Sequence, residues 1–407
     1  MKLKVFKENP QIDGNITVTG SKSESNRLLI LQALFGNIKI KNLSNSDDSQ
    51  VMQKALASHD KIVDVHHAGT AMRFLTAYFA AYDGRETILT GSSRMQERPI
   101  GILVDALRRL GADITYQNKE GYAPLLIKGK RLEKSEVKLE AHVSSQYISA
   151  LMMVGAKLPN GLKIELLGKT TSVPYIEMTR ALLTQIGVKS SFQGDVIEIF
   201  HQDTVDKQTL VVESDWSSAS YYYSLVALSR KAKITLSSYK ENSLQGDASL
   251  AHFYEKLGVK TTFSDHKITL EKIENAPLQA VSFDLSNSPD IAQTIAVTCY
   301  GLGVGCNLTG LHTLKIKETD RLLALHTELS KLGAQLGVTK DSLHLEPAKV
   351  YNPDITIKTY QDHRMAMAFA PLALKMPILF EDAEVVNKSY PDFWNDFTSL
   401  GFEITTV

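Results

Sequence analysis

The chain has 407 residues, which suggests two domains, because single hydrophobic cores stop growing at roughly 250–300 residues. Its 45 Lys and Arg residues balance 45 Asp and Glu residues, so no overall basic field exists to hold a nucleic acid or an anionic membrane. A hydrophobic fraction of 43% with 22% charged residues is typical of globular proteins and argues against disordered or collagen-like classes. Any anionic ligand must therefore be bound by a local group of cations.

The N-terminal segment MKLKVFKENP predicts a charged strand followed by a turn. It lacks the long apolar core that is typical of a signal peptide. The longest uncharged run, residues 291–311, contains polar residues and four glycines, so it predicts a buried helix, a turn and a strand rather than a membrane span. Cys299 and Cys306 both lie in this apolar stretch, which favours buried thiols in a reducing compartment. We therefore expect a cytoplasmic protein.

Six short polar phrases recur along the chain, each directly before an alanine-rich or apolar stretch. Each contains Ser, Asp, Thr or Gly where it can cap the free backbone N–H groups of a helix, and they begin at positions 20, 67, 144, 215, 288 and 361. Short β-branched runs such as LKIELLG and HKITLEK fill the intervals and predict strands. The expected repeat is strand, helix, strand, helix, strand, strand.

A second series marks the ends of helices. Five glycines follow amphipathic segments at spacings of 68 to 76 residues, where a helix needs a left-handed residue to stop: Gly111, Gly187, Gly258, Gly333 and Gly401. The first interval between helix starts is only 47 residues, so we expect the first repeat to lack a hairpin.

These spacings predict an α/β protein with three βαβαββ units in each of two domains, the first unit being truncated. The chain would cross between the domains near residues 211–215. Because the opening strand precedes the first unit, we expect it to pair with the later half. The expected domains are residues 20–213 and residues 1–19 plus 214–407.

Several helix starts carry basic residues, and a helix N-terminus itself attracts anions. GSKSESNR at 20–27, RMQERPIG at 94–101 and KETDR at 317–321 would each, alone, suit a solvated or salt-bridged surface. QDHRMAMAF at 361–369 differs, because its charged residues precede an almost fully apolar helix and so require partners. Together the phrases predict a site for small polyanions.

In this order the phrases resemble the family of 5-enolpyruvylshikimate-3-phosphate synthases, over positions 20 to 394. The resemblance rests on GSKSESNR, AGTAMR, RMQERPIG, SSQ, SVPY, SPD, KETDR, DHRMAM and NKSYPDFW. It implies a two-domain inverse α/β barrel. It also implies transfer of the enolpyruvyl group of phosphoenolpyruvate to the 5-hydroxyl of shikimate 3-phosphate, with release of phosphate, by addition and elimination through a tetrahedral intermediate in the cleft between domains.

The resemblance places the chain in the shikimate pathway to chorismate and the aromatic amino acids, as a target of glyphosate. It assigns shikimate 3-phosphate to Lys22, Ser23, Arg27, Ser144, Ser145, Gln146, Ser172, Tyr175, Asp290, Thr313 and Lys317. It assigns phosphoenolpyruvate to Lys22, His67, Gly69, Arg98, Gln146, Arg321, Arg364 and Lys388. The catalytic residues implied are Lys22 as proton donor, Asp290 and Glu318 as bases, and His363. No cofactor or metal, no nucleic acid and no membrane is implied, and we expect a monomer.

Three positions depart from the pattern of this family. His67 replaces an amide that contacts phosphoenolpyruvate, Phe74 replaces a proline, and Thr313 stands where many members have an asparagine. His66 and His67 are not expected to bind a metal, because adjacent histidines rarely share one ion. We expect His67 and Phe74 to disturb the start of their helix and to weaken inhibition by glyphosate, although Gly69 is retained.

Three alternatives remain open at this point. The sister enolpyruvyl transferases that act on UDP-N-acetylglucosamine carry a reactive cysteine in a glycine-rich loop, whereas here ERPIG fills that region. An RNA-terminal phosphate enzyme is opposed by the neutral net charge. A non-catalytic anion-binding scaffold is opposed by the retained Lys22, Asp290, Glu318 and His363.

Overall fold

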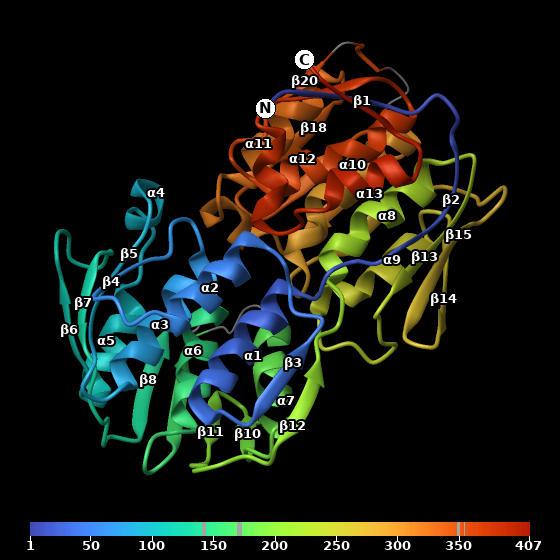
Figure 1. The fold of residues 1–407 in the computed structure, drawn as a ribbon. Helices are drawn as coiled ribbons and strands as arrows, with labels where there is room; N and C mark the ends of the chain where they lie inside the picture. Colours follow the sequence, from blue (N-terminus) through green and yellow to red (C-terminus); the bar gives the residue numbers. More distant parts are fainter. Residues whose placement is uncertain (141–143, 169–172, 348–350, 354) are drawn as a thin grey trace. The chain divides into compact units, whose positions relative to one another are not determined.

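The computed structural model describes residues 1–140, 144–168, 173–347, 351–353 and 355–407. These residues form two compact units (Figure 1). The N-terminal unit is Gly20–Val212, and the C-terminal unit is Met1–Thr19 together with Glu213–Val407. The bounds of these units differ by one residue from the domains expected from the sequence, and that division into domains remains a prediction.

The N-terminal unit alternates strands with helices. Its elements are α1 (Lys22–Phe35), β3 (Ile38–Lys41), α2 (Asp47–Ala57), β4 (Ile62–Asp64), α3 (Gly69–Ala81), β5 (Glu86–Thr90), α4 (Ser93–Gln96), α5 (Gly101–Leu110), β6 (Asp113–Tyr116), β7 (Leu125–Lys128), β8 (Glu136–Glu140), α6 (Ser145–Gly155), β9 (Leu162–Leu167), α7 (Val173–Gln185), β10 (Ser190–Gln193), β11 (Val196–Ile199) and β12 (Gln208–Val211).

The C-terminal unit begins with two strands from the start of the chain, β1 (Leu3–Phe6) and β2 (Gln11–Ile16). It continues with α8 (Trp216–Leu228), β13 (Lys231–Ser237), η1 (Gly246–Ser249), α9 (Leu250–Glu255), β14 (Val259–Ser264), β15 (Lys267–Lys272), β16 (Val281–Asp284), η2 (Pro289–Ile291), α10 (Ala292–Leu302), β17 (Cys306–Thr309), η3 (His312–Ile316), α11 (Arg321–Lys331), β18 (Leu336–Val338), β19 (Leu343–Leu345), β20 (Thr356–Ile357), α12 (His363–Phe369), η4 (Ala370–Leu374), β21 (Ile378–Phe380), η5 (Ala383–Lys388), α13 (Phe393–Ser399) and β22 (Glu403–Thr406).

The four-stranded sheets of both units share one plan. Each begins with a parallel pair, to which two further strands are added in antiparallel orientation. Their orders are β4-β5-β7-β6, β8-β9-β11-β10, β2-β13-β15-β14, β16-β17-β19-β18 and β20-β21-β1-β22. The repeat expected from the sequence is therefore present in the strand order.

The sheet of the first repeat is reduced to the parallel pair of β3 and β12, in which Ile38 lies opposite Gln208. The short first interval in the sequence thus corresponds to a missing hairpin. The chain crosses between the two units twice, once after β2 and once after β12. β2 pairs with β13 in the C-terminal unit, and β12 pairs with β3 in the N-terminal unit.

The opening strand β1 lies between β21 and β22, so that Leu3 pairs with both Phe380 and Thr406. Figure 1 shows this blue strand among the red C-terminal elements, with both chain ends nearby. The expected pairing of the N-terminal strand with the later half is confirmed, and β1 occupies the position that a hairpin strand has in the other four-stranded sheets.

The five glycines of the helix-stop series all have positive φ, between 82° and 108°. Each lies between a helix and the outermost strand of its sheet, in the pairs α5 and β6, α7 and β10, α9 and β14, α11 and β18, and α13 and β22. Only glycine adopts this conformation without a steric penalty, so these glycines end the five helices as predicted.

The cores contain helices that are buried on every face. All residues of α8 are buried, and α12 is buried throughout as well. In the N-terminal unit, every residue of α6 is buried except Gln146, which is half-buried. A helix of this kind requires neighbours on all sides, which the surrounding sheets and helices supply.

Four of the six expected helix starts carry a side-chain cap. The capping residues are Ser21, Ser144, Asp215 and Asp362. The expectation is wrong at the other two starts: Ala68 precedes α3, and Ser288 precedes the short turn η2 without a capping hydrogen bond.

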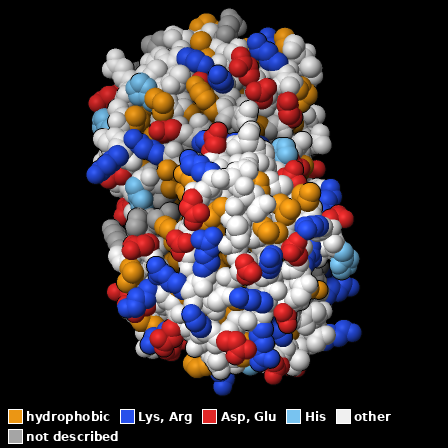
Figure 2. All heavy atoms as spheres, turned by 90° about the vertical axis from the view of Figure 1, so that its left-hand side faces the viewer, with side chains coloured by type: hydrophobic (Ala, Val, Ile, Leu, Met, Phe, Trp, Pro, Cys, Tyr) orange, Lys and Arg blue, Asp and Glu red, His pale blue; other side chains and the backbone are white. Residues whose placement is uncertain are grey.

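On the face seen in Figure 2, Lys and Arg side chains are interspersed with Asp and Glu side chains, in keeping with the formal net charge of +0. None of the helices in the described part of the chain combines the length and the apolar character that a membrane crossing requires.

Candidate functional site

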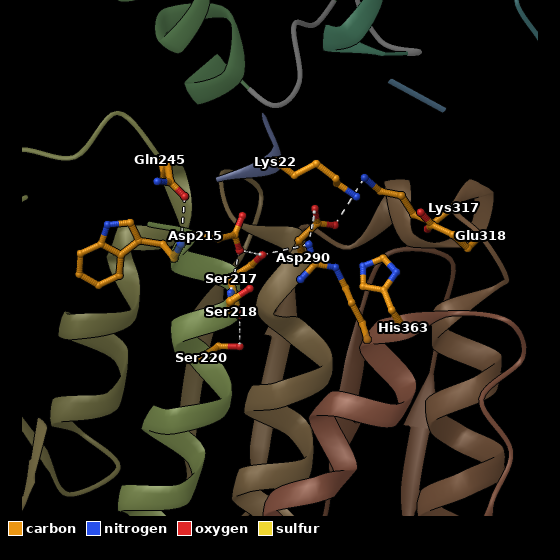
Figure 3. A network of polar contacts seen from close by, with 12 residues as sticks. Lys22, Asp215, Ser217, Ser218, Ser220, Gln245, Asp290, Lys317, Glu318 and His363 are labelled. Atoms are coloured by element: carbon orange, nitrogen blue, oxygen red, sulfur yellow. Dashed lines mark hydrogen bonds and ion pairs between the residues drawn. The ribbon is translucent and has the colours of Figure 1, made fainter. Parts of the chain in front are cut away.

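Asp290 is the centre of a charged cluster in the C-terminal unit. It lies in η2, directly before the buried helix α10. Its carboxylate oxygens are 2.9 Å from Nη1 of Arg321, 3.2 Å from Nη2 of Arg364 and 3.5 Å from Nζ of Lys317. Figure 3 shows Asp290 between Asp215 and Ser217 on one side and Lys317, Glu318 and His363 on the other. Three cations around one carboxylate stabilise its negative charge.

Arg321 joins three carboxylates from three parts of the chain. Its Nε lies 2.6 Å from Asp362, its Nη2 lies 2.8 Å from Glu318, and its Nη1 contacts Asp290. The side chain is only 2% exposed. Burial by itself lowers the pKa of Arg321, but the charges of Asp362, Glu318 and Asp290 raise it above the ordinary value. Arg321 is thus a permanent cation that holds the starts of η2, α11 and α12 together.

Arg364 connects the same cluster to α8. Its Nη2 donates to Oγ of Ser217 at 3.1 Å, and Ser217 in turn donates to Oδ1 of Asp215 at 2.7 Å. Although burial lowers the pKa of Arg364, the nearby carboxylate of Asp290 raises it well above the ordinary value. The starts of α8, α10 and α12 are therefore linked by charged hydrogen bonds.

Asp247 is a functional candidate that sequence reasoning missed. It lies in η1, is only 7% exposed, and has Asp290, Arg364 and Lys317 as charged neighbours. Burial, followed by the charge of Asp290, raises the pKa of Asp247 from 3.8 to about 7. This carboxyl can exchange a proton near neutral pH. The local sequence QGD carries no catalytic signature, so only the long-range contacts reveal it.

The other assigned residues of this unit differ in their environment. His363 is buried as the first residue of α12, with Nδ1 4.0 Å from Oδ1 of Asp362. Nζ of Lys388 donates to the carbonyl of Gln361 at 2.7 Å. Thr313 lies in η3, and its buried hydroxyl has no hydrogen-bond partner among the described residues.

In the N-terminal unit, cations gather at the start of α3. A Cβ on Gly69 would lie 2.6 Å from Nη1 of Arg98 and 3.0 Å from Nη1 of Arg73, so glycine permits the close approach of both guanidinium groups. Lys22 lies 3.6 Å from Asp48, a buried carboxylate that also faces Nε2 of His67 at 4.0 Å. Sequence reasoning missed Asp48, which lies in an ordinary polar segment, and it assigned no role to Arg73, although Arg73 ends the phrase AGTAMR.

Arg27 is buried among neutral oxygen atoms. Its guanidinium donates to Thr179 at 2.7 Å, to Ser149 at 3.0 Å and to the carbonyl of Ser23 at 2.9 Å. Burial lowers the pKa of Arg27 to about 10. We expected Phe74 to act at the start of α3, but it lies one turn further on, where its fully buried ring packs beside Arg27.

The start of α6 connects to the start of α3. Ser144 caps α6 by accepting from the backbone of Gln146, and Nε2 of Gln146 donates to Oγ1 of Thr70 at 3.3 Å. Ser145 is buried in the first turn, and the carbonyl of Tyr175 in α7 accepts from Arg27 at 3.3 Å. Ser172, also assigned to shikimate 3-phosphate, lies outside the described residues.

The structure therefore brings the assigned residues together in two groups, one in each unit. In the described part of the chain, no three His, Cys, Asp or Glu side chains are arranged to hold a metal ion. Both groups instead combine cations, hydroxyls and helix starts, which suit phosphate and carboxylate ligands. The carboxylates of the C-terminal unit add groups that can accept protons.

The comparisons with known proteins agree with this chemistry. The family model of EPSP synthase (3-phosphoshikimate 1-carboxyvinyltransferase) matches residues 53–397. A 3-phosphoshikimate 1-carboxyvinyltransferase of Bacteroides fragilis is 47% identical over 398 residues, covering 97% of each chain, and one of Haemophilus influenzae is 37% identical over 96% of each chain.

Solved structures share the fold. The EPSP synthase of Acinetobacter baumannii aligns over 100% of both chains with a TM-score of 0.82 and 20% identity. The enolpyruvyl transferase NikO of Streptomyces tendae aligns over 99% of this chain and 98% of that chain, with a TM-score of 0.76 and 14% identity. The family match and the two full-length relatives lead to one conclusion: the chain belongs to the EPSP synthase (3-phosphoshikimate 1-carboxyvinyltransferase) family.

Proposed function

We propose that the chain transfers the enolpyruvyl group of phosphoenolpyruvate to the 5-hydroxyl of shikimate 3-phosphate and releases inorganic phosphate. The observation that supports this most strongly is the cluster around Asp290, in which a carboxylate is surrounded by Lys317, Arg321 and Arg364. Such a cluster can accept a proton and can also stabilise an anionic substrate.

The chemistry has two steps. In the addition, the 5-hydroxyl oxygen bonds to C2 of phosphoenolpyruvate, the hydroxyl proton leaves, and C3 gains a proton. In the elimination, C3 loses a proton, the C2–O bond to phosphate breaks, and the double bond returns. We assign the hydroxyl proton to Asp290, proton exchange at C3 to Lys22 and Glu318, and a supporting catalytic role to His363.

Substrate binding is assigned by chemistry. Phosphoenolpyruvate carries a carboxylate and a phosphate, which match the planar guanidinium groups of Arg98, Arg321 and Arg364 and the amine of Lys388. Lys22, His67, Gly69 and Gln146 complete this set. For shikimate 3-phosphate we retain Lys22, Ser23, Arg27, Ser144, Ser145, Gln146, Ser172, Tyr175, Asp290, Thr313 and Lys317.

Phosphate release provides the direct test. The purified chain is incubated with phosphoenolpyruvate and either shikimate 3-phosphate, UDP-N-acetylglucosamine or no acceptor. We expect phosphate to appear only with shikimate 3-phosphate, together with an equal amount of enolpyruvyl product. Release that depends on UDP-N-acetylglucosamine, or no release with either acceptor, would overturn the proposal.

We further propose that the enzyme works as a monomer in the cytoplasm. Cys299 and Cys306 are free and buried, which fits a reducing compartment. Light scattering should give the mass of one chain, 45.1 kDa. A mass of two chains would contradict the monomer.

A further inference from the structure

Two adjacent histidines contact each other directly before α3. Nδ1 of His66 lies 2.8 Å from Nδ1 of His67, and the two rings meet edge to face at 82°. At this distance two bare nitrogens, or two N–H groups, would repel each other. The contact therefore requires one proton between the two atoms, so that one histidine donates and the other accepts.

The remaining ring nitrogen of His67 faces a carboxylate. Nε2 lies 4.0 Å from Oδ1 of Asp48, while Oδ2 of Asp48 lies 3.6 Å from Nζ of Lys22. A buried carboxylate favours a proton on the nitrogen that faces it. With hydrogen on Nε2 of His67, Nδ1 of His67 accepts from Nδ1–H of His66 in the neutral pair.

The backbone of His66 is held in an uncommon conformation. Its φ is +48°, in the left-handed region that histidine tolerates better than most residues with a side chain. Its N–H donates to Oδ1 of Asp64 at 2.7 Å, and its carbonyl accepts from the N–H of Ser92 at 2.9 Å. Both peptide groups are therefore fixed, which directs the His66 ring toward His67.

The pair adjoins the cations at the start of α3. His67 is two residues before Gly69, beside which Arg98 and Arg73 place their guanidinium groups. The charged groups in this region include Lys22 on α1, Asp48 on α2, Asp64 on β4, Arg73 on α3, and Arg98 in the segment before α5. An anion at this helix start would thus meet several positive groups together with the imidazole pair.

We propose that His66 and His67 act as one proton-sharing pair that binds an anionic group of phosphoenolpyruvate, with His67 as the binding residue and His66 as its positioning residue. The inference rests on the proposed function. One extra proton fits on Nε2 of His66 and gives the pair a single positive charge. A second extra proton would have to go to Nδ1 of His67 and would force the two Nδ1–H groups against each other. An anion stabilises that single charge, so binding of phosphoenolpyruvate takes up a proton.

The test is the pH dependence of KM for each substrate between pH 6.5 and 8.5. The native chain is compared with His66→Asn and His67→Asn, and with the exposed His59→Asn as a matched control in the same unit. Asparagine tolerates the left-handed backbone at position 66. Because phosphoenolpyruvate itself titrates near neutral pH, only the difference between variants reports on the protein.

Between pH 6.5 and 8.5, we expect KM for phosphoenolpyruvate to rise about three- to tenfold more in the native chain and in His59→Asn than in His66→Asn and His67→Asn. Uptake of one proton can change KM by at most about tenfold per pH unit. KM for shikimate 3-phosphate should show no such difference. Nitrogen NMR of the imidazoles should find Nε2 of His67 protonated at pH 8.

Active variants whose phosphoenolpyruvate profiles match the native profile would overturn the inference, as would a bare Nε2 on His67. A native chain that releases no phosphate at any pH would instead overturn the proposed function. The NMR measurement does not depend on turnover, so the two failures are distinguishable.

Discussion

Phe74 places its ring over the guanidinium of Arg27, with 5.3 Å between Cζ and the ring centroid. Both side chains are buried, and Arg27 donates hydrogen bonds to the neutral oxygen atoms of Thr179, Ser149, Ser23 and Tyr175. An aromatic face is a favourable neighbour for a desolvated cation, with an interaction of about 2 kcal/mol at buried sites. The ring at position 74 thus contacts a residue assigned to shikimate 3-phosphate, and its effect on the start of α3 remains a prediction.

Replacing Phe74 by leucine should therefore raise KM for shikimate 3-phosphate several-fold while leaving KM for phosphoenolpyruvate nearly unchanged. The matched control is Phe79→Leu on the same helix, because the ring of Phe79 covers Arg85 instead. Both variants should lower the melting temperature, but only Phe74→Leu should change KM. Equal KM values in the two variants would contradict the role of this ring.

Asp290→Asn should lower kcat by roughly 10²–10⁴-fold, the range typical of a lost general base. Since the size of the side chain is kept, binding of phosphoenolpyruvate should largely persist. Phosphate release under saturating substrates measures the effect, and Asp265→Asn in an exposed turn is the control. Near-native turnover in Asp290→Asn would transfer the role of base to another group, with Glu318 the next to test.

Asp247 should make stability depend on pH. Because its pKa is raised from 3.8 to about 7 in the folded state, the folded protein retains a proton there that the unfolded chain loses above pH 4. Its contribution to the free energy of unfolding therefore falls as pH rises from about 4 to about 7.

We expect Asp247→Asn to have a melting temperature that exceeds the native value by an increasing amount between pH 5 and pH 8, reaching several degrees. Thermal unfolding at each pH measures this difference, with Asp265→Asn as a control that should follow the native curve. A constant difference across the range would show that Asp247 does not exchange the proton.

Gly69→Ala should weaken glyphosate inhibition more than it raises KM for phosphoenolpyruvate. The added Cβ would lie 2.6 Å from Nη1 of Arg98, so the guanidinium must move and the space at the helix start must shrink. Gly337→Ala is the control, because a Cβ there meets nothing within 4 Å. Inhibition series with phosphoenolpyruvate as the competing substrate provide the measurement. Parallel changes in both constants would mean that the two ligands use the space equally.

The repeat could be predicted from the sequence because its signals are local. A glycine such as Gly187 ends the helix beside it through its own backbone conformation, and the short first interval directly reports a missing hairpin. The prediction of side-chain caps was wrong for α3 and η2. Ala68 precedes α3 and Ser288 precedes η2, and neither side chain makes a capping hydrogen bond.

The site could be predicted only where a phrase carried the chemistry. Asp290 and Arg321 belong to such phrases, but their pairing depends on how α10 and α11 pack. Asp48 and Asp247 lie in ordinary polar segments, and only tertiary contacts bring them beside Lys22 and Asp290. Long-range electrostatics of this kind leave no periodic pattern in a sequence.

The position of β1 between β21 and β22 has a consequence for synthesis on the ribosome. Residues 20–212 contain every strand of their own sheets, so we expect this unit to fold once it has emerged. The partners of β1, by contrast, are β21 and β22, which are synthesised only after the whole N-terminal unit. β1 thus waits unpaired while the intervening residues are made, which leaves its edges exposed to chaperones during synthesis.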